Sequence, residues 1–374
     1  MKTHGRLFAL VALGASSLSA APFVALGDNA ELFLTGAVVV NFDDNIYLRP
    51  GTTARPEVSD TVLTFTPGVD LVFGRNAATS GNFYFREDIL RYSDNDQQNT
   101  SLTNVGFNSL YNNGKSKVDL GASYTEYAQN DTSVPGDIVE RDVTSLRALS
   151  EFSATEKTSV GVGARFEKTD YSGGPGYRDS SIWTLPLDAY FEYSPKLQWS
   201  AGYRYRSTEL SGSSIGSKDH FFNIGARGEF TPKLTGQLRV GYGLRKLDNG
   251  TDDSDFGVDS SFAYAYSPKT SYSLGISNDF GSSALGESTK SFSVNVGANN
   301  RIDEQWSWNA NLAYRSTDFP AHSDDFLQGG VGVAYVLNNN VNFTASYTHR
   351  KNSSDSALFE FANNVFSFGA NLRY

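Results

Sequence analysis

The chain has 374 residues, a formal net charge of −10, no cysteine and an aromatic content of 13%. The lack of cysteine excludes disulfides and thiolate metal sites, and the acidic balance argues against a nucleic-acid partner, which needs a basic face. Beyond the first residues, no apolar run approaches the roughly 18 residues of a transmembrane helix, so any membrane-spanning part must be built from strands.

The first residues are typical of a secretory signal peptide. Lys2 and Arg6 supply a positively charged start, and the apolar stretch Leu7–Ala15 follows it. This stretch is long enough for a signal peptide and too short to span a bilayer as a helix. The alternative is a short N-terminal helix of the folded domain.

Two cleavage points fit the end of this leader. Ser19–Ala21 offers small residues, but Pro22 would follow the cut, whereas Ala25–Gly27 has the small-x-small pattern. We favour the second point and expect a leader over residues 1–27 and a single mature domain over residues 28–374.

The remainder of the chain is one repeated pattern of strands with an apolar and a polar face. Near the C-terminus, for example, Val341, Phe343, Ala345 and Tyr347 alternate with Asn342, Thr344, Ser346 and Thr348. We expect an all-β, up-and-down antiparallel transmembrane barrel of about 18 strands, with 16 as the alternative count. The expected strands cover residues 31–42, 61–73, 82–91, 101–111, 116–127, 142–153, 157–168, 181–194, 196–208, 219–230, 233–246, 256–266, 269–279, 290–300, 304–316, 325–336, 340–350 and 359–374.

The connections alternate between short turns and longer acidic loops, as in outer-membrane barrels with short periplasmic turns and longer extracellular loops. The short turns lie at Asn112–Lys115, Ser153–Lys157, Ser194–Lys196, Thr231–Lys233, Ser267–Lys269, Arg301–Gln305 and Leu337–Asn340. The longer loops include Gln129–Arg141, Asp170–Asp179, Asp248–Asp255 and Arg350–Ser356. Three short turns share the pattern Ser/Thr-Pro-Lys, in which proline presets φ for a tight turn.

Aromatic residues gather beside the short turns, which indicates an interfacial belt at the periplasmic side of the membrane. They are Tyr190, Phe191, Tyr193, Phe230, Tyr264, Tyr266, Trp306, Trp308 and Tyr335. At the end of the chain, Phe366, Phe368, Ala370 and Leu372 alternate up to a terminal Tyr374. This ending is similar to the C-terminal assembly signal of outer-membrane barrels, which implies the barrel-insertion machinery as a partner.

A more specific signal lies near the N-terminus. Asp43–Leu48 reads DDNIYL, Ser59 and Asp60 follow, and Thr66–Leu71 reads TPGVDL. This order resembles the β-barrel porin 2 family, some of whose members occur in exopolysaccharide gene clusters. The resemblance implies an outer-membrane barrel and leaves the transported solute open.

The polar faces of the strands predict a charged lumen. Inward-facing basic residues concentrate on three consecutive expected strands over residues 196–246, where we identify Arg204, Arg206, Arg227, Arg239 and Arg245 as lumen-lining candidates, with Arg147, Arg165 and Arg315 elsewhere. Asp188 and Glu192 are the acidic lumen-lining candidates on the preceding strand. Two interpretations follow: a one-sided arginine wall that orients carboxylate or phosphate groups of a solute, or internal ion pairs that stiffen the barrel.

The sequence gives little support to catalysis. Apart from His4 in the leader, only His220, His322 and His349 are present, and the acids beside them are common in all the loops. The acidic segment 249–255 lacks the closing glutamate of a calcium loop. We therefore expect no enzyme, no cofactor and no metal site.

These observations predict an outer-membrane barrel, surrounded by lipid, that lets small hydrophilic solutes pass through an aqueous lumen. A barrel of this size leaves a channel unless something fills it, and no long segment offers an obvious plug. The alternatives are a conduit for exopolysaccharide export and a non-transporting surface structure or receptor.

Overall fold

The computed structural model describes residues 20–173, 176–212 and 215–374. Most of the predicted leader therefore lies outside the described residues. The described part of the chain consists of strands and one short 3₁₀ helix, η1 (Asp96–Gln98). In this part, no helix has the length and apolar character needed to cross a bilayer.

Nineteen strands form one antiparallel sheet that closes on itself. Their bounds are β1 Val24–Leu26, β2 Ala30–Asp43, β3 Asp60–Phe73, β4 Thr79–Tyr92, β5 Thr100–Asn112, β6 Ser116–Asp131, β7 Val134–Ser153, β8 Thr158–Ser172, β9 Ser180–Ser194, β10 Leu197–Leu210, β11 Ser217–Thr231, β12 Leu234–Leu247, β13 Asp252–Ala265, β14 Thr270–Ser282, β15 Ser288–Arg301, β16 Trp306–Asp318, β17 Ser323–Val336, β18 Val341–Ser354 and β19 Phe361–Arg373.

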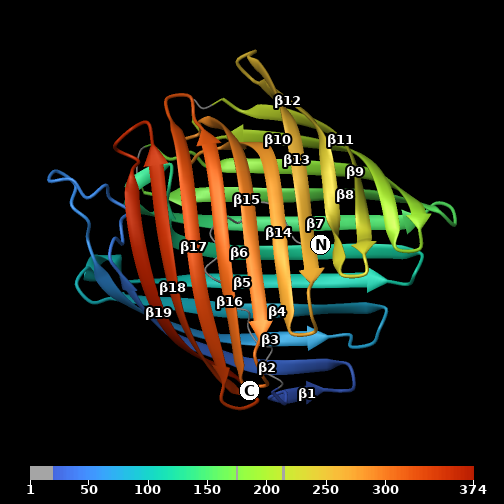
Figure 1. Ribbon diagram of the computed structural model, residues 1–374, viewed down its shortest axis with the longest axis horizontal. Helices are drawn as coiled ribbons and strands as arrows, with labels where there is room; N and C mark the ends of the chain where they lie inside the picture. Colours follow the sequence, from blue (N-terminus) through green and yellow to red (C-terminus); the bar gives the residue numbers. More distant parts are fainter. Residues whose placement is uncertain (1–19, 174–175, 213–214) are drawn as a thin grey trace.

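Strands β2 to β19 make the barrel, and each pairs with its neighbours in sequence. The barrel closes where β19 pairs with β2, from Thr35↔Arg373 to Asp43↔Val365. The strands of the front and back walls cross in Figure 1, as expected from the tilt of a closed barrel. The predicted all-β barrel of about 18 strands is confirmed, and the alternative count of 16 is wrong.

The additional strand β1 was not predicted. It pairs with β2 over Val24↔Leu32 to Leu26↔Ala30, on the β2 edge beyond the end of β19. The Phe23 ring lies 6.0 Å from the Tyr374 ring, and the C-terminus lies beside β1 in Figure 1. β1 therefore extends the seam at which the barrel closes.

The two faces of the barrel differ as the alternation predicts. Large apolar side chains such as Phe222, Ile224 and Leu312 are more than half exposed on the outside, where lipid replaces water. Rings cluster near the short turns, including Tyr193 with Trp199 and Trp306 with Tyr335. This arrangement matches the expected interfacial belt.

The short turns share one hydrogen-bonding device. In each, a side-chain oxygen accepts hydrogen bonds from the backbone N–H groups two and three residues later. The accepting residues are Asn113, Thr155, Ser194, Thr231, Ser267, Asp303 and Asn338. Serine, threonine, aspartate and asparagine favour turns for this reason.

The three Ser/Thr-Pro-Lys turns are also linked to their neighbours. Lys196 Nζ donates to Glu229 Oε2 at 2.6 Å, Lys233 Nζ to the Tyr266 carbonyl at 2.8 Å, and Lys269 Nζ to the Ile302 carbonyl at 2.6 Å. Each lysine thus reaches the next short turn along the rim. The repeated motif therefore defines the turn and also connects it to the following hairpin.

Candidate functional site

All seven lumen-lining candidates lie on the inner face of one wall of the barrel, on strands β9 to β12. Asp188 and Glu192 lie on β9, Arg204 and Arg206 on β10, Arg227 on β11, and Arg239 and Arg245 on β12. Their sequence neighbours Leu187, Phe191 and Trp199 are about half exposed on the outer face. The strand alternation that aims the apolar residues at lipid aims these charges at the lumen.

Two carboxylates hold three of the arginines near the extracellular end. Asp219 accepts from Arg245 Nε at 2.7 Å and Nη2 at 2.8 Å, and from Arg206 Nε at 2.7 Å. Asp279 on β14 accepts from Arg204 Nη2 at 2.8 Å and from Arg206 Nη1 at 3.1 Å. The Arg245 side chain is 1% exposed and that of Asp219 4% exposed, so this network is sealed within the wall.

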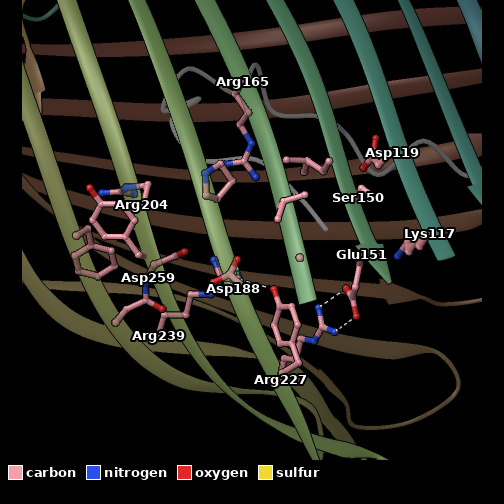
Figure 2. A pocket seen from close by; sticks show the side chains of 18 residues that line it. Lys117, Asp119, Ser150, Glu151, Arg165, Asp188, Arg204, Arg227, Arg239 and Asp259 are labelled. Carbon is pink, nitrogen blue, oxygen red and sulfur yellow. Dashed lines mark hydrogen bonds and ion pairs between the residues drawn. The ribbon is translucent and has the colours of Figure 1, made fainter. Parts of the chain in front are cut away.

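A second group of ion pairs lies closer to the short turns. Arg227 donates two hydrogen bonds to the Glu151 carboxylate of β7, from Nη1 at 2.9 Å and from Nη2 at 2.5 Å. Its guanidinium also stacks over the Tyr190 ring, 3.3 Å from the ring centroid. Arg239 Nη2 donates to Asp188 at 3.1 Å and to the Tyr190 hydroxyl at 3.0 Å. Figure 2 shows the Arg227–Glu151 pair as two parallel contacts.

Gly202 on β10 allows Asp188 to reach Arg239. A Cβ on Gly202 would overlap Asp188 Oδ1 and would lie 3.0 Å from Asn223 Oδ1. The missing side chain therefore lets the carboxylate lie flat across the neighbouring strand.

Of the two interpretations of the arginines, the ion-pair arrangement describes the five candidates. Each one has a carboxylate partner within 3.1 Å. The sequence places the arginines on one wall, but the partners come from as far away as β7 and β14, which the sequence pattern does not show.

The extracellular mouth differs from the sequence expectation. Gln129–Arg141 was predicted as a long external loop, but β6 and β7 continue through it as a hairpin with register Gln129↔Val139. We call residues 130–139 the mouth hairpin. Val139 is fully buried, and Thr132 and Ser133 are each 6% exposed. The segment is therefore packed against the protein and not extended into water.

The mouth hairpin reaches across the lumen. Thr132 Oγ1 accepts from Arg315 Nη2 at 2.7 Å, and Arg315 lies on β16. In the order of the 18 barrel strands, β16 lies opposite β6 and β7. The expectation that no segment obstructs the lumen is therefore wrong at the mouth, because hydrogen bonds between distant residues draw this hairpin inward.

The N-terminal motif supports the mouth hairpin from below. Asn130 Nδ2 donates to the Ile46 carbonyl at 2.7 Å, and the Gly136 amide donates to the Tyr47 carbonyl at 2.9 Å. Leu48 packs with Phe326 and Phe361 in a small buried cluster. The motif residues Asn45 to Leu48 are all buried, with Asn45 fully so.

The rest of the motif shapes neighbouring loops. Asp60 accepts from the backbone N–H groups of Ser93 at 3.0 Å and Asn95 at 2.9 Å, and from Asn95 Nδ2 at 2.8 Å. A Cβ on Gly68 would lie 2.8 Å from Arg86 Cγ and from the Phe85 carbonyl, so the glycine lets β3 and β4 approach closely. The motif thus has a structural role at the mouth that its amino-acid sequence alone does not reveal.

The histidines have local partners. His220 Nδ1 lies 2.7 Å from the Tyr203 hydroxyl, and His349 Nδ1 lies 2.9 Å from Asn364 Oδ1. His322 is stacked between Phe319 and Phe359, with ring centroids 4.4 and 3.9 Å away. The described residues contain no group of three or more histidine, cysteine, aspartate or glutamate side chains that could hold a metal ion.

The predicted assembly residues lie on the outer face of the last strand. Phe366, Phe368, Leu372 and Tyr374 are each about half exposed. The backbone of Tyr374 exchanges hydrogen bonds with Leu34, at 2.6 and 2.8 Å. The terminal residue therefore closes the barrel seam as well as ending the aromatic pattern.

This closed barrel, with an apolar outer band and a charged lumen, defines an outer-membrane channel. The chain belongs to the family described as "Putative beta-barrel porin 2", whose model matches residues 37–374. The predicted resemblance and the outer-membrane location are thereby confirmed. Porins are channels without enzymatic activity, so the family match places this protein among channels and not among enzymes.

Solved structures of porins are similar in overall shape. A BenF-like porin from Pseudomonas fluorescens Pf-5 shares 12% identity over 93% of this chain and 99% of its own, with a TM-score of 0.49. OccAB2 from Acinetobacter baumannii shares 10% identity over 93% and 98% (TM-score 0.49), and OpdL from Pseudomonas aeruginosa 10% over 92% and 98% (TM-score 0.48). A search of curated proteins finds no match. The assignment therefore rests on the family match.

Proposed function

We propose that small hydrophilic solutes cross the barrel along its charged wall and pass beside the mouth hairpin at the extracellular end. The Thr132–Arg315 hydrogen bond carries this proposal, because it fastens the hairpin to the opposite wall. A barrel of this size would otherwise leave a wide channel. The hairpin divides that opening and favours small solutes over a polymer.

The other functions have less support. Neither the family match nor the geometry supports the exopolysaccharide conduit, since a polymer chain would have to displace the hairpin and the Asn45–Leu48 segment beneath it. A non-transporting surface structure or receptor would require the narrowed mouth to be fully closed. Conductance distinguishes this last function from a channel.

The test is ion conductance of the purified protein in a planar bilayer. The wild-type barrel should conduct, and the double variant Thr132→Ala/Arg315→Ala should conduct about twofold more, because the released hairpin no longer divides the mouth. Thr344→Ala, a lumen-facing change on β18, is the control and should leave conductance unchanged. A folded wild-type barrel that never conducts would refute passage. Conductance seen only in the double variant would indicate a gated channel.

The same proposal includes assembly by the barrel-insertion machinery through the C-terminal strand. The outward positions of Phe366, Phe368, Leu372 and Tyr374 support it, since their rings and side chains are accessible on an exposed face. Tyr374→Asp should lower the yield of heat-modifiable, folded barrel in the outer membrane. Tyr374→Phe should preserve it, and an unchanged yield for both would leave the terminal aromatic an ordinary strand residue.

We also propose that the leader is a cleaved signal peptide and that the cut precedes Phe23. Cleavage after Gly27 would remove β1, whereas cleavage near Ser19–Ala21 would retain its pairing with β2 and the Phe23–Tyr374 contact. N-terminal sequencing of the mature protein tests this proposal. A mature chain that begins at Asp28 would contradict it.

A further inference from the structure

One lumen arginine on strands β6 to β14 differs from its neighbours on these strands because it forms no ion pair among the described residues. Among the described residues, none forms an ion pair or side-chain hydrogen bond with Arg165 of β8, and its Nε is buried without a hydrogen-bond acceptor. No interaction line reaches its guanidinium in Figure 2. Because an arginine side chain is always protonated and carries five N–H donors, Arg165 presents to the lumen a cation that contacts no described carboxylate.

The surroundings of Arg165 reinforce this positive charge. Arg147 lies directly opposite Arg165 in the β7–β8 register. The charges of Arg147, Arg239 and Arg204 all act on Arg165, and Asp259 provides the attraction that opposes them. Arg147, Arg239 and Arg204 each have a carboxylate partner, at 2.8, 3.1 and 2.8 Å. Arg165 is therefore the one member of this group that forms no ion pair among the described residues.

A cavity of about 110 Å³ in the barrel wall adjoins Arg165. Its described lining has five cationic side chains and four anionic ones, which leaves one positive charge. The cations are Lys117, Arg165, Arg204, Arg227 and Arg239, and the anions are Asp119, Glu151, Asp188 and Asp259. The cavity therefore carries a net positive charge, and Arg165 is its one guanidinium without an ion pair among the described residues.

We propose that Arg165 binds the carboxylate group of a singly charged organic anion as it passes through the lumen. This inference rests on the proposed function and names its solute class. The planar guanidinium matches the two oxygens of a carboxylate, and the pair is strong when both hydrogen bonds form. One excess charge fits a monocarboxylate better than phosphate, which carries about one and a half negative charges or more at neutral pH.

The ion pairs around the cavity serve this site by holding the other arginines against the wall. Arg227 and Arg239 are fixed by Glu151 and Asp188, and their shared contact with Tyr190 keeps both guanidinium groups beside the ring. A solute anion therefore meets one available guanidinium within a region of near-balanced charge. Such a site attracts the anion and still allows it to leave, which passage through a channel requires.

The test uses the full-length mature barrel in planar bilayers at low ionic strength, with potassium lactate as the probe. Lactate should reduce the chloride current with a saturable dependence on concentration. Arg165→Gln should raise the half-blocking lactate concentration about tenfold, which corresponds to about 1.4 kcal/mol. Arg165→Lys, which keeps the charge but loses the planar fork, should give a smaller increase.

Arg86→Gln is the matched control. Arg86 on β4 is also a lumen arginine, but it is paired with Asp70 at 3.0 Å and lies outside the cavity lining. Its substitution removes the same charge and should leave the half-blocking concentration of lactate nearly unchanged. If Arg165→Gln fails to give heat-modifiable barrel, the comparison of Arg165→Lys with wild type provides the same test.

Each alternative result has a distinct meaning. Equal shifts for Arg165→Gln and Arg86→Gln would replace the site by a general effect of lumen charge and overturn the proposal. Stronger block by phosphate than by lactate would overturn the monocarboxylate assignment. Unchanged block in a conducting Arg165→Gln barrel would remove Arg165 and leave passive passage intact, whereas a folded wild type without conductance would refute passage itself.

Discussion

The two halves of the barrel wall build the same structure from different side chains. In the half from β15 to β19 together with β2, the lumen-facing charges Arg315, Arg350 and Asp43 lie toward the extracellular end, and the wall between them and the short turns relies on serine, threonine, asparagine and glycine. We call this half the uncharged half for that reason. The half from β6 to β14 carries seven arginines in the same position, most of them paired with carboxylates from other strands. Backbone pairing is continuous through both halves. The charges are therefore not needed to close the barrel.

The comparison teaches that lumen charge here is mostly neutralised where it arises. Paired arginines stiffen the wall, but each directs its guanidinium group at a carboxylate of the protein. The unpaired Arg165 and the uncharged half remain free to interact with a solute. The location of function in the lumen thus depends on which charges lack partners and not on how many charges there are.

The largest expected effect is a difference between the two halves in how much one lumen substitution lowers the free energy of unfolding. Asp219→Ala should lower the free energy of unfolding by about 3–5 kcal/mol, because it leaves the buried Arg245 without a carboxylate and removes one of the two carboxylates that Arg206 contacts. Asn371→Ala, which breaks a hydrogen bond to Asn342 in the uncharged half, should cost about 0.5–1.5 kcal/mol. Urea unfolding of both variants in lipid vesicles measures the difference, and equal losses would contradict a special role for the charged network.

A charge placed on the uncharged half should change selectivity more than stability. Asn295 is exposed on the lumen face of β15, where neither β15 nor β16 carries an acidic side chain on this face and Arg315 of β16 is the nearest charge in the register of the two strands. Asn295→Glu should therefore shift the reversal potential in a KCl gradient toward cation selectivity, most strongly at low salt. Asn295→Gln is the neutral control. An unchanged potential for the glutamate variant would mean that ions do not pass along this half.

The short turns should contribute equally to the free energy of unfolding in both halves. Ser267 caps the turn between β13 and β14, and Asn338 caps the turn between β17 and β18, each by accepting two backbone hydrogen bonds. Alanine at either position should lower the free energy of unfolding by about 1 kcal/mol. Similar losses in vesicle unfolding are expected, and a loss confined to one half would show that the turns depend on the wall above them.

The smallest expected effect is a pH dependence at one turn. Hydrogen bonds from the Trp306 and Gln305 backbone amides lower the pKa of Asp303 below its ordinary value of 3.8. A lowered folded-state pKa stabilises the barrel above the ordinary value, and this stabilisation is lost as the pH falls through the folded-state pKa. Unfolding measured from pH 6 down to about pH 2 should therefore show a steeper acid loss for wild type than for Asp303→Asn. Identical slopes would refute this contribution.

The sequence by itself determined the barrel and the inward direction of the candidate arginines. These properties follow from local rules: strand side chains alternate with a period of two, and turns need particular residue types. The alternation around Arg204 and Arg206 thus predicts their lumen face, and Ser267 predicts its turn. The same rules bring Phe366, Phe368, Leu372 and Tyr374 to the outer surface.

Only the tertiary structure decided which groups meet across the lumen. Arg227 donates a hydrogen bond to Glu151, which lies four strands away, and Thr132 accepts one from Arg315 on the far side of the barrel. The inward fold of the mouth hairpin and the isolation of Arg165 follow from such contacts. Barrel closure, tilt and stagger set these distances, and they depend on the pairing of all the strands together, so no local pattern of residues contains them.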